Sequence, residues 1–147
     1  MKILCDTDTI VASIAVGHQF HEEAWHVREL VNKGEVAGHI STHCLAEVYA
    51  ILTRAPFQPK FTPTEVWQVL EDDILPTFEI IALDQADYRR TVEACSRQRW
   101  VGGRIYDALH IAAARKAECD ILYTFNVRHF RELAPDLATR IRAPQLP

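Results

Sequence analysis

Three acidic residues, Asp6, Glu47 and Asp107, stand where the sequence otherwise predicts buried structure. Asp6 directly follows an apolar segment, residues 2–5, and so comes at the end of a predicted strand. Glu47 and Asp107 fall within predicted helices, on or beside the apolar face. Removing a carboxylate from water is costly unless a hydrogen bond or a positive charge compensates for it. Three such acids in one small chain indicate convergence on a single point.

The two helical assignments rest on residue spacing, because positions three and four apart share a helix face. The residues near Glu47 on its face are Cys44, Val48 and Ile51, and those sharing the face of Asp107 are Gly103, Ile111 and Ala114. Asp is also a poor residue for a helix interior, so local preference does not explain Asp107.

Each acid also has a purely structural explanation. Asp6 or Thr7 could cap the helix that follows. Glu47 could flank the apolar stripe and extend its head group into solvent, and Asp107 could be a hydrogen-bonded structural group. His110 could be a second-shell partner of the site, although a packed core histidine is the explanation that its apolar surroundings favour.

The chemistry that three converging carboxylates could perform follows from their charge. Like charges that approach one another raise each other's pKa unless a cation holds them ionised, and no Lys or Arg lies beside all three in the sequence. Oxygen ligands without Cys or His suit Mg²⁺ or Mn²⁺. Such ions serve phosphoryl chemistry, so the acids predict hydrolysis of a phosphate ester.

The elements that must position these acids alternate along the chain. Strands are predicted over residues 2–5, 36–40, 78–83, 121–124 and 140–142, and helices over residues 7–15, 21–33, 42–54, 62–75, 84–99, 105–118 and 127–133. Thr42 and Asp84 are predicted helix caps. Trp25, Leu30 and Val31 are predicted to face inward. The alternation predicts an α/β fold whose parallel sheet is covered on both faces, with its site beyond the carboxyl ends of the strands.

Composition places this fold in a broad class. The chain has 147 residues, of which 48% are apolar, which is enough for one domain with a substantial core. No apolar run approaches the roughly 18 residues of a membrane helix, and no secretory signal precedes Asp6. The four cysteines are widely spaced and indicate free thiols in a reducing compartment. We therefore expect a soluble cytoplasmic protein without membrane partners.

The formal net charge of −4 is unevenly distributed. Residues 1–87 carry 5 basic and 14 acidic side chains, whereas residues 88–147 carry 11 basic and 6 acidic ones. Ten of the eleven C-terminal cations are Arg, whose guanidinium matches phosphate and carboxylate geometry. The basic half is either an ordinary solvated surface or a face that binds an anionic partner.

Four segments of the chain resemble the motifs of PIN-domain ribonucleases. They are residues 3–11 (ILCDTDTIV), 45–54 (LAEVYAILTR), 103–110 (GRIYDALH) and 122–130 (LYTFNVRHF). In size the chain is most similar to the VapC-type toxins of bacterial toxin–antitoxin pairs. The resemblance implies a single three-layer α/β/α domain over residues 1–147, with a central, mostly parallel sheet of four to five strands. It also implies endoribonuclease activity that depends on Mg²⁺ or, as a substitute, Mn²⁺, together with homodimers and a cognate antitoxin partner.

Carried over to this sequence, the resemblance assigns the acidic metal site to Asp6, Glu47 and Asp107. Asn126 occupies a fourth catalytic position where many members have an acid, so it can orient water but brings no charge. Asp8 and Thr124 are secondary candidates. Asp120, at the other end of its strand, is too far away. The candidate contacts to RNA or antitoxin are Arg104, Arg128 and Arg131.

Two other functions remain open. The segment Asp6-x-Asp8 also looks like the nucleophile loop of haloacid-dehalogenase-type phosphatases, which need a later Lys and a paired-acid loop. Lys116 is the only Lys after residue 60, and no G-D-x-x-x-D loop occurs. A catalytically silent PIN fold that only binds RNA or protein is the other. A di-iron bundle is remote, because the chain offers only Asp107-x-x-His110.

Overall fold

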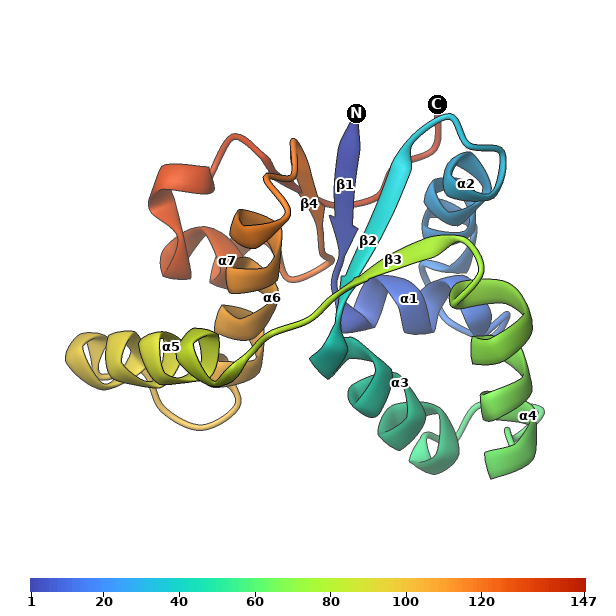
Figure 1. Ribbon diagram of the computed structural model, residues 1–147. Coiled ribbons are helices and arrows are strands. Elements are labelled where there is room, and N and C mark those ends of the chain that lie inside the picture. Colours follow the sequence, from blue (N-terminus) through green and yellow to red (C-terminus); the bar gives the residue numbers. More distant parts are fainter.

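The computed structural model describes residues 1–147 and contains one five-stranded sheet in the order β3-β2-β1-β4-β5 (Figure 1). The strands are β1 (Lys2–Cys5), β2 (Ala37–Ser41), β3 (Phe78–Ile81), β4 (Ile121–Tyr123) and β5 (Ile141–Arg142). All neighbouring pairs are parallel. The α/β class and the parallel sheet are therefore confirmed. Because β1 is the central strand, Asp6 follows it at the middle of the carboxyl edge.

Helices cover both faces of this sheet. They are α1 (Thr7–Ile14), α2 (His21–Asn32), α3 (Thr42–Arg54), α4 (Pro63–Val69), α5 (Gln85–Gln98), α6 (Arg104–Lys116) and α7 (Val127–Leu133), with a π-helical turn, η1 (Leu70–Ile74), and a 3₁₀ turn, η2 (Pro135–Leu137). Helices α1 to α4 lie on one side and α5 to α7 on the other (Figure 1). None of these helices combines the length and apolar character that crossing a membrane requires.

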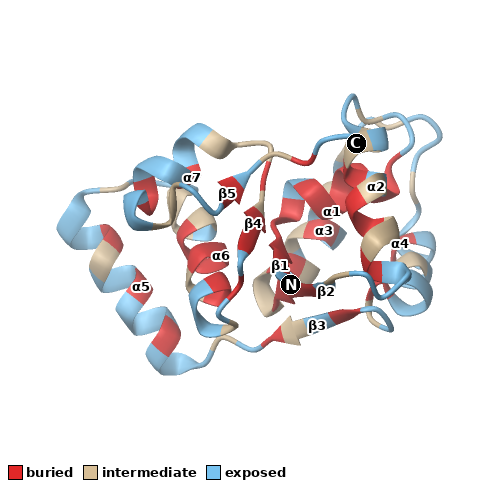
Figure 2. Ribbon diagram, turned by 90° about the horizontal axis from the view of Figure 1, so that it is seen from above, coloured by how far each residue is buried: buried red, intermediate tan, exposed pale blue.

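Two hydrophobic cores separate the three layers. Buried residues line the sheet and the helix faces turned toward it (Figure 2). Ile3 and Cys5 belong to the core under α1 to α4, whereas Leu4 belongs to the core under α6 and α7. Successive strand side chains point to opposite faces, so a strand buried on both sides must be apolar throughout. This requirement accounts for the apolar segment that ends at Asp6.

Several helix ends follow the predicted local signals. Asp84 caps α5 by accepting a hydrogen bond from the Asp87 N–H at 2.9 Å. The predicted cap Thr42 is wrong, because Ser41 caps α3 by accepting from the Cys44 N–H at 3.1 Å. Thr42 instead accepts a bond from the Leu83 N–H at 3.4 Å. Strand β2 ends one residue later than predicted, so its last residue, Ser41, is also the cap of α3.

The inward face of α2 is also different from the prediction. Its buried residues are Ala24, Val27, Arg28 and Val31, a regular helical stripe. Trp25 lies next to this stripe and is 41% exposed, with the Arg28 guanidinium 4.7 Å from the centre of its ring. Arg28 reaches the Asp73 carboxylate at 3.0 Å. Trp25 was predicted to face inward, but the helical period places Ala24 and Arg28 on the buried face instead.

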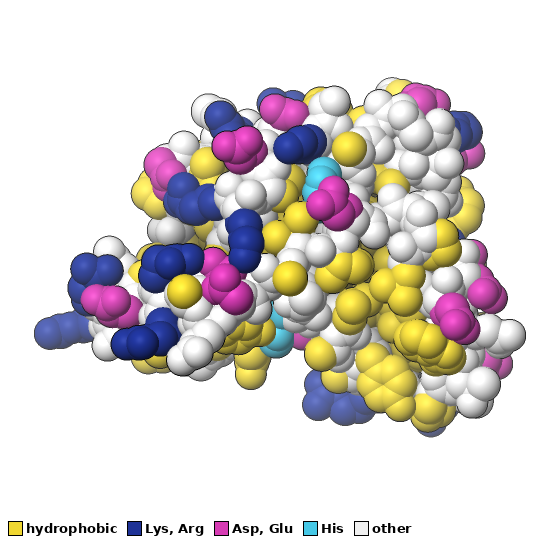
Figure 3. All heavy atoms as spheres, in the orientation of Figure 1, with side chains coloured by type: hydrophobic (Ala, Val, Ile, Leu, Met, Phe, Trp, Pro, Cys, Tyr) yellow, Lys and Arg dark blue, Asp and Glu magenta, His cyan; other side chains and the backbone are white.

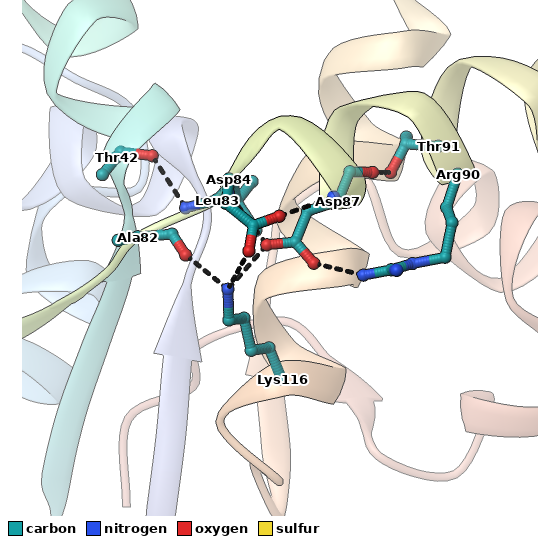
Figure 4. Close-up of polar contacts among 8 residues, drawn as sticks. All are labelled: Thr42, Ala82, Leu83, Asp84, Asp87, Arg90, Thr91 and Lys116. Carbon is teal, nitrogen blue, oxygen red and sulfur yellow. Dashed lines mark hydrogen bonds and ion pairs between the residues drawn. The ribbon is translucent and has the colours of Figure 1, made fainter.

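Lys116 fixes the connection between β3 and α5 (Figure 4). Its ammonium donates to the Ala82 carbonyl at 2.8 Å and to the Asp87 carboxylate at 2.6 Å. The hydrogen bond from Lys116 lowers the pKa of Asp87 to about 2. Strand β3 ends at Ile81, opposite the last residue of β2, and is two residues shorter than predicted. The contacts of Lys116 therefore join the end of α6 to the start of α5.

Gly38 in β2 is required by the close approach of α2 to the sheet. A Cβ atom at this position would lie 2.6 Å from Val31 Cγ1 and 2.9 Å from Phe78 Cδ1. We expect Gly38→Ala to lower the free energy of unfolding by about 1–3 kcal/mol, because overpacking displaces both neighbours. Thermal melting of this variant measures the effect. The matched control is Gly17→Ala, whose Cβ would meet only Gln58 O at 3.8 Å. A Gly38→Ala protein that melts no lower than the wild type would contradict the packing argument.

Candidate active site

Asp6 lies at the carboxyl end of β1 and is only 4% exposed. Its Oδ1 accepts a hydrogen bond from the Thr9 N–H at 2.9 Å, so the residue does cap α1, as the structural alternative predicted. Burial raises the pKa of Asp6, and the charge of His110 and a hydrogen bond with Thr124 only partly offset this effect. Capping occupies one carboxylate oxygen of Asp6 and does not exclude a role in a site.

Glu47 projects from α3 toward the same edge, and its side chain is 24% exposed. Oε1 accepts hydrogen bonds from Thr7 Oγ1 at 2.8 Å and from His110 Nε2 at 3.0 Å. His43 Nε2 lies 3.2 Å from the same oxygen, without hydrogen-bond geometry. Burial opposes ionisation of Glu47, but the bonds from His110 and Thr7 and the nearby His43 outweigh it and lower its pKa. Glu47 therefore does not simply extend into solvent, and it is held as a carboxylate.

His110 connects this carboxylate to the rest of the fold. The ring is 2% exposed, as a core histidine would be, but both of its nitrogens have polar partners. Nδ1 lies 3.2 Å from Ser41 Oγ, and the Ser41 hydroxyl oxygen already accepts from a backbone N–H. Because the Glu47 carboxylate oxygen can only accept, the Nε2–H of His110 donates to it. His110 is therefore a buried core histidine, as expected, and it also hydrogen-bonds to a candidate site residue.

Asp107 stands in the first turn of α6 and has no hydrogen-bond or ion-pair partner. Its pKa is raised to about 6, chiefly by burial, then by the nearby carboxylates of Asp6, Glu47 and Asp8, against a lowering effect of His110. The three acids predicted to converge thus come from β1, α3 and α6 and act on one another electrostatically. Of the three acids, only Asp107 lacks a hydrogen-bond partner within the protein.

The oxygen atoms left free at this place fit a hard divalent cation. Glu47 Oε2 and both oxygens of Asp107 have no hydrogen-bond partner, and burial raises the thiol pKa of the nearby Cys5 and Cys44, which disfavours the thiolate that a metal would bind. Carboxylate oxygens are the ligands that Mg²⁺ and Mn²⁺ prefer. No group of three or more His, Cys, Asp or Glu side chains is drawn together closely enough to hold an ion. The donor chemistry fits, whereas a preformed coordination shell is absent.

The secondary candidates lie beside this cluster. Asp8 and Asn126 line one cavity of ≈270 Å³. The Asn126 N–H donates to Thr124 Oγ1 at 3.0 Å, and its side-chain amide lies 3.0 Å from His129 Nδ1. Asp120 is far away, because its carboxylate accepts from the Lys2 N–H at the amino end of the sheet. Asp8 and Asn126 thus remain candidate residues of the active site, whereas Asp120 lies at the opposite edge of the sheet.

The three candidate arginines are already engaged within the protein. Arg104 and Arg128 each donate to the Glu132 carboxylate at 3.0 Å, and Arg131 donates to the Ile141 carbonyl at 2.9 Å. Lys and Arg side chains nevertheless gather over the half of the molecule that carries α5 to α7 (Figure 3). Contacts of these arginines with RNA or an antitoxin stay a prediction.

Sequence reasoning missed three polar residues around Glu47, namely Thr7, Ser41 and His43. The only local signal was the four-residue spacing of His43 and Glu47, which places both on one helix face. Tyr106 stacks on His43 with ring centres 4.8 Å apart. The phosphatase alternative gains no support, because Lys116 is bound to Ala82 and Asp87 and has no contact with Asp6 or Asp8.

Comparison with known proteins places this arrangement in a family. Residues 3–135 match the family described as the PIN domain. The chain is 34% identical over 117 residues to the ribonuclease VapC40 of Mycobacterium tuberculosis, a match that covers 80% of this chain and 81% of the relative.

Solved structures share the fold at lower identity. VapC20 of Mycobacterium tuberculosis, a sarcin–ricin loop cleaving toxin, superposes with a TM-score of 0.66 at 19% identity and covers 84% of this chain and 89% of its own. VapBC2 of Rickettsia felis, solved with a DNA fragment from its promoter, gives 0.64 at 18% identity over 91% and 94% of the two chains. The parallel sheet with its flanking helices is shared with these solved structures, and the family match spans most of the sequence. The chain therefore belongs to the PIN domain family.

Proposed function

We propose that this protein is a divalent-metal-dependent endoribonuclease and the toxin of a toxin–antitoxin pair that acts in the cytoplasm. The observation that carries the proposal is that buried Asp6 and partly buried Glu47 and Asp107 lie at one edge of the sheet, and that Asp107 has no hydrogen-bond or ion-pair partner. The relationship to the ribonuclease VapC40 supports RNA as the substrate class.

Asp6 and Asp107 would hold the metal ion, and Glu47 would bind it directly or through a water molecule. When bound, Mg²⁺, or Mn²⁺ as a substitute, supplies a Lewis acid that polarises the phosphodiester and lowers the pKa of a water molecule. The unpaired charge of Asp107 makes this position the one that gains most from a cation.

The chain's own residues would orient the reacting groups. His110 and Thr7 fix Glu47 through Oε1, so Oε2 keeps one direction and can accept a hydrogen bond from the attacking water. The amide of Asn126 can orient water without adding charge. In-line attack would leave a 5′-phosphate and a 3′-hydroxyl on the products.

The partners belong to the same proposal. VapBC2 contains two kinds of component, which supports a cognate antitoxin for this chain. Large apolar side chains such as Tyr49 and Trp67 are 44% and 51% exposed and could be covered in a homodimer or an antitoxin complex. Arg104, Arg128 and Arg131 would exchange their present contacts for phosphates or acidic side chains.

We expect Asp6→Ala and Asp107→Ala each to lower RNA cleavage by more than about 100-fold, since losing even an indirect partner of a metal ligand costs about 10–100-fold. Gel analysis of labelled RNA incubated with protein and Mg²⁺ measures this loss, and EDTA should abolish wild-type cleavage. The matched control is Asp72→Ala, because Asp72 is an exposed acid of η1 without a partner. Wild-type rates in either site variant would remove that acid from the mechanism. No cleavage by the wild type would favour a silent binding module.

We expect Asp107→Asn to stabilise the metal-free protein at pH 7 by about 1 kcal/mol, a value reduced for solvent screening. Because the pKa of Asp107 is raised to about 6 on folding, the folded chain keeps a proton between about pH 4 and pH 6 that the unfolded chain has lost. Wild-type stability therefore falls as pH rises through this window, and the variant lacks this component. Melting temperatures in EDTA at both ends of the window measure it.

With added Mg²⁺ the wild type should instead melt at a higher temperature than Asp107→Asn, because a ligand that binds only the folded protein stabilises it. If Asp107→Asn melts at or below the temperature of the wild type in EDTA at pH 7, the neighbouring carboxylates do not destabilise the charged form of Asp107.

A further inference from the structure

The cavity shared by Asp8 and Asn126 is bordered by aromatic rings. Its lining residues are Asp8, His18, Gln19, Phe20, Phe125 and Asn126. The rings of Phe20 and Phe125 are stacked, with centres 4.6 Å apart and planes 14° from parallel. The ring of His18 lies 6.0 Å from Phe20 and 6.2 Å from Phe125. Three flat rings thus meet beside two candidate site residues.

These rings come from two turns that adjoin the carboxylate cluster. Phe20 ends the turn between α1 and α2, and α1 begins directly after Asp6. Phe125 stands between Thr124, whose side chain lowers the pKa of Asp6, and Asn126. The stack is therefore continuous with the candidate active site and is not an isolated surface feature.

The exposure of the rings leaves them accessible. Phe20 is 37% exposed, and Phe125 and His18 are half-buried. His18 Nδ1 accepts a hydrogen bond from the Phe20 N–H at 3.1 Å, which requires an unprotonated nitrogen. Burial also lowers the pKa of His18, against the charge of Asp8. His18 therefore contributes an uncharged aromatic ring.

The polar groups around the rings suit the edge of a base. Asp8 offers acceptors, whereas the amides of Gln19 and Asn126 offer both donors and acceptors. None of the six lining residues is Lys or Arg, so the cavity does not suit a phosphate. Its ≈270 Å³ lies below the usual size of a drug-sized ligand pocket and matches a single ring system, not a partner helix. Unpaired nucleobases stack on aromatic side chains and hydrogen-bond through their edges.

We propose that Phe20, Phe125 and His18 form a subsite that stacks an unpaired nucleobase of the RNA next to the scissile phosphate. This inference rests on the proposed ribonuclease function and names its substrate class as single-stranded or looped RNA. A paired base within a duplex cannot enter the cavity, because its faces are already stacked. The subsite recognises the base, while the carboxylate cluster acts on the backbone.

Binding to single-stranded RNA in EDTA tests the subsite without cleavage. The probes are fluorescently labelled homopolymers of each of the four ribonucleotides, and a ribose-phosphate chain of equal length without bases. We expect the wild type to bind at least one homopolymer more tightly than the abasic chain. Phe20→Ala and Phe125→Leu should weaken that binding by about 5- to 100-fold, since stacking contributes about 1–3 kcal/mol per base. Phe125→Leu keeps apolar bulk but removes the aromatic face.

Two further variants separate stacking from folding. Phe20→Trp keeps a flat ring and should retain most of the affinity, whereas Tyr88→Ala removes an aromatic side chain of α5 that is 38% exposed and should change nothing. Melting temperatures of all variants show whether each is folded.

Several results would overturn the subsite. Equal wild-type affinity for the abasic chain would do so, as would the absence of binding to every homopolymer. Unchanged RNA affinity in both Phe20→Ala and Phe125→Leu would also overturn it and would assign the cavity to a protein partner. Cleavage by the wild type in Mg²⁺ is scored separately. Base-dependent binding without cleavage would therefore retain the subsite and reject the ribonuclease.

Discussion

The hydrogen bonds at Glu47 Oε1 join parts of the fold that lie on opposite sides of the sheet. Thr7 belongs to α1 and Glu47 to α3, both on one face, whereas His110 belongs to α6 on the other (Figure 1). Ser41, at the end of β2, completes the set through the second nitrogen of His110. Because these groups meet just beyond the carboxyl edge, the sheet's strand order determines where the site can form. A buried carboxylate in this position is tolerable only with such partners.

The surroundings of Glu47 and Asp107 shift the pKa values of these two acids in opposite directions. Partners lower the pKa of Glu47, whereas burial and like charges raise that of Asp107. Divergent environments for neighbouring carboxylates are typical of sites that assign them different tasks. Here the hydrogen bonds of Glu47 hold it ionised and oriented, whereas Asp107 has no such bond.

The basic C-terminal half of the chain provides fewer unpaired cations than its composition indicates. The basic C-terminal half does form one region of the surface (Figure 3). Several of its cations are nevertheless paired internally, as Arg115 is with Asp136 at 2.6 Å and Arg104 with Glu132 at 3.0 Å. Exposed pairs of this kind are weak and can be exchanged for an anionic partner. The cavity bordered by Phe20 and Phe125, in contrast, is lined by no Lys or Arg.

Local signals in the sequence are enough to predict the order of strands and helices, the α/β class and the three candidate acids. Apolar strands, the Asp84 cap and acids on apolar faces can all be recognised within a short window. The hydrogen-bond partners of those acids depend instead on contacts between distant segments of the chain. His110 and Glu47 are 63 residues apart, and Phe20 and Phe125 meet across the turns that end α1 and β4. Spacing along one helix shows which face a residue occupies, but not which other element packs against that face. For this reason Thr7, Ser41 and His43 could not be assigned in advance, and the burial of His110 was predictable whereas its bond to Glu47 was not.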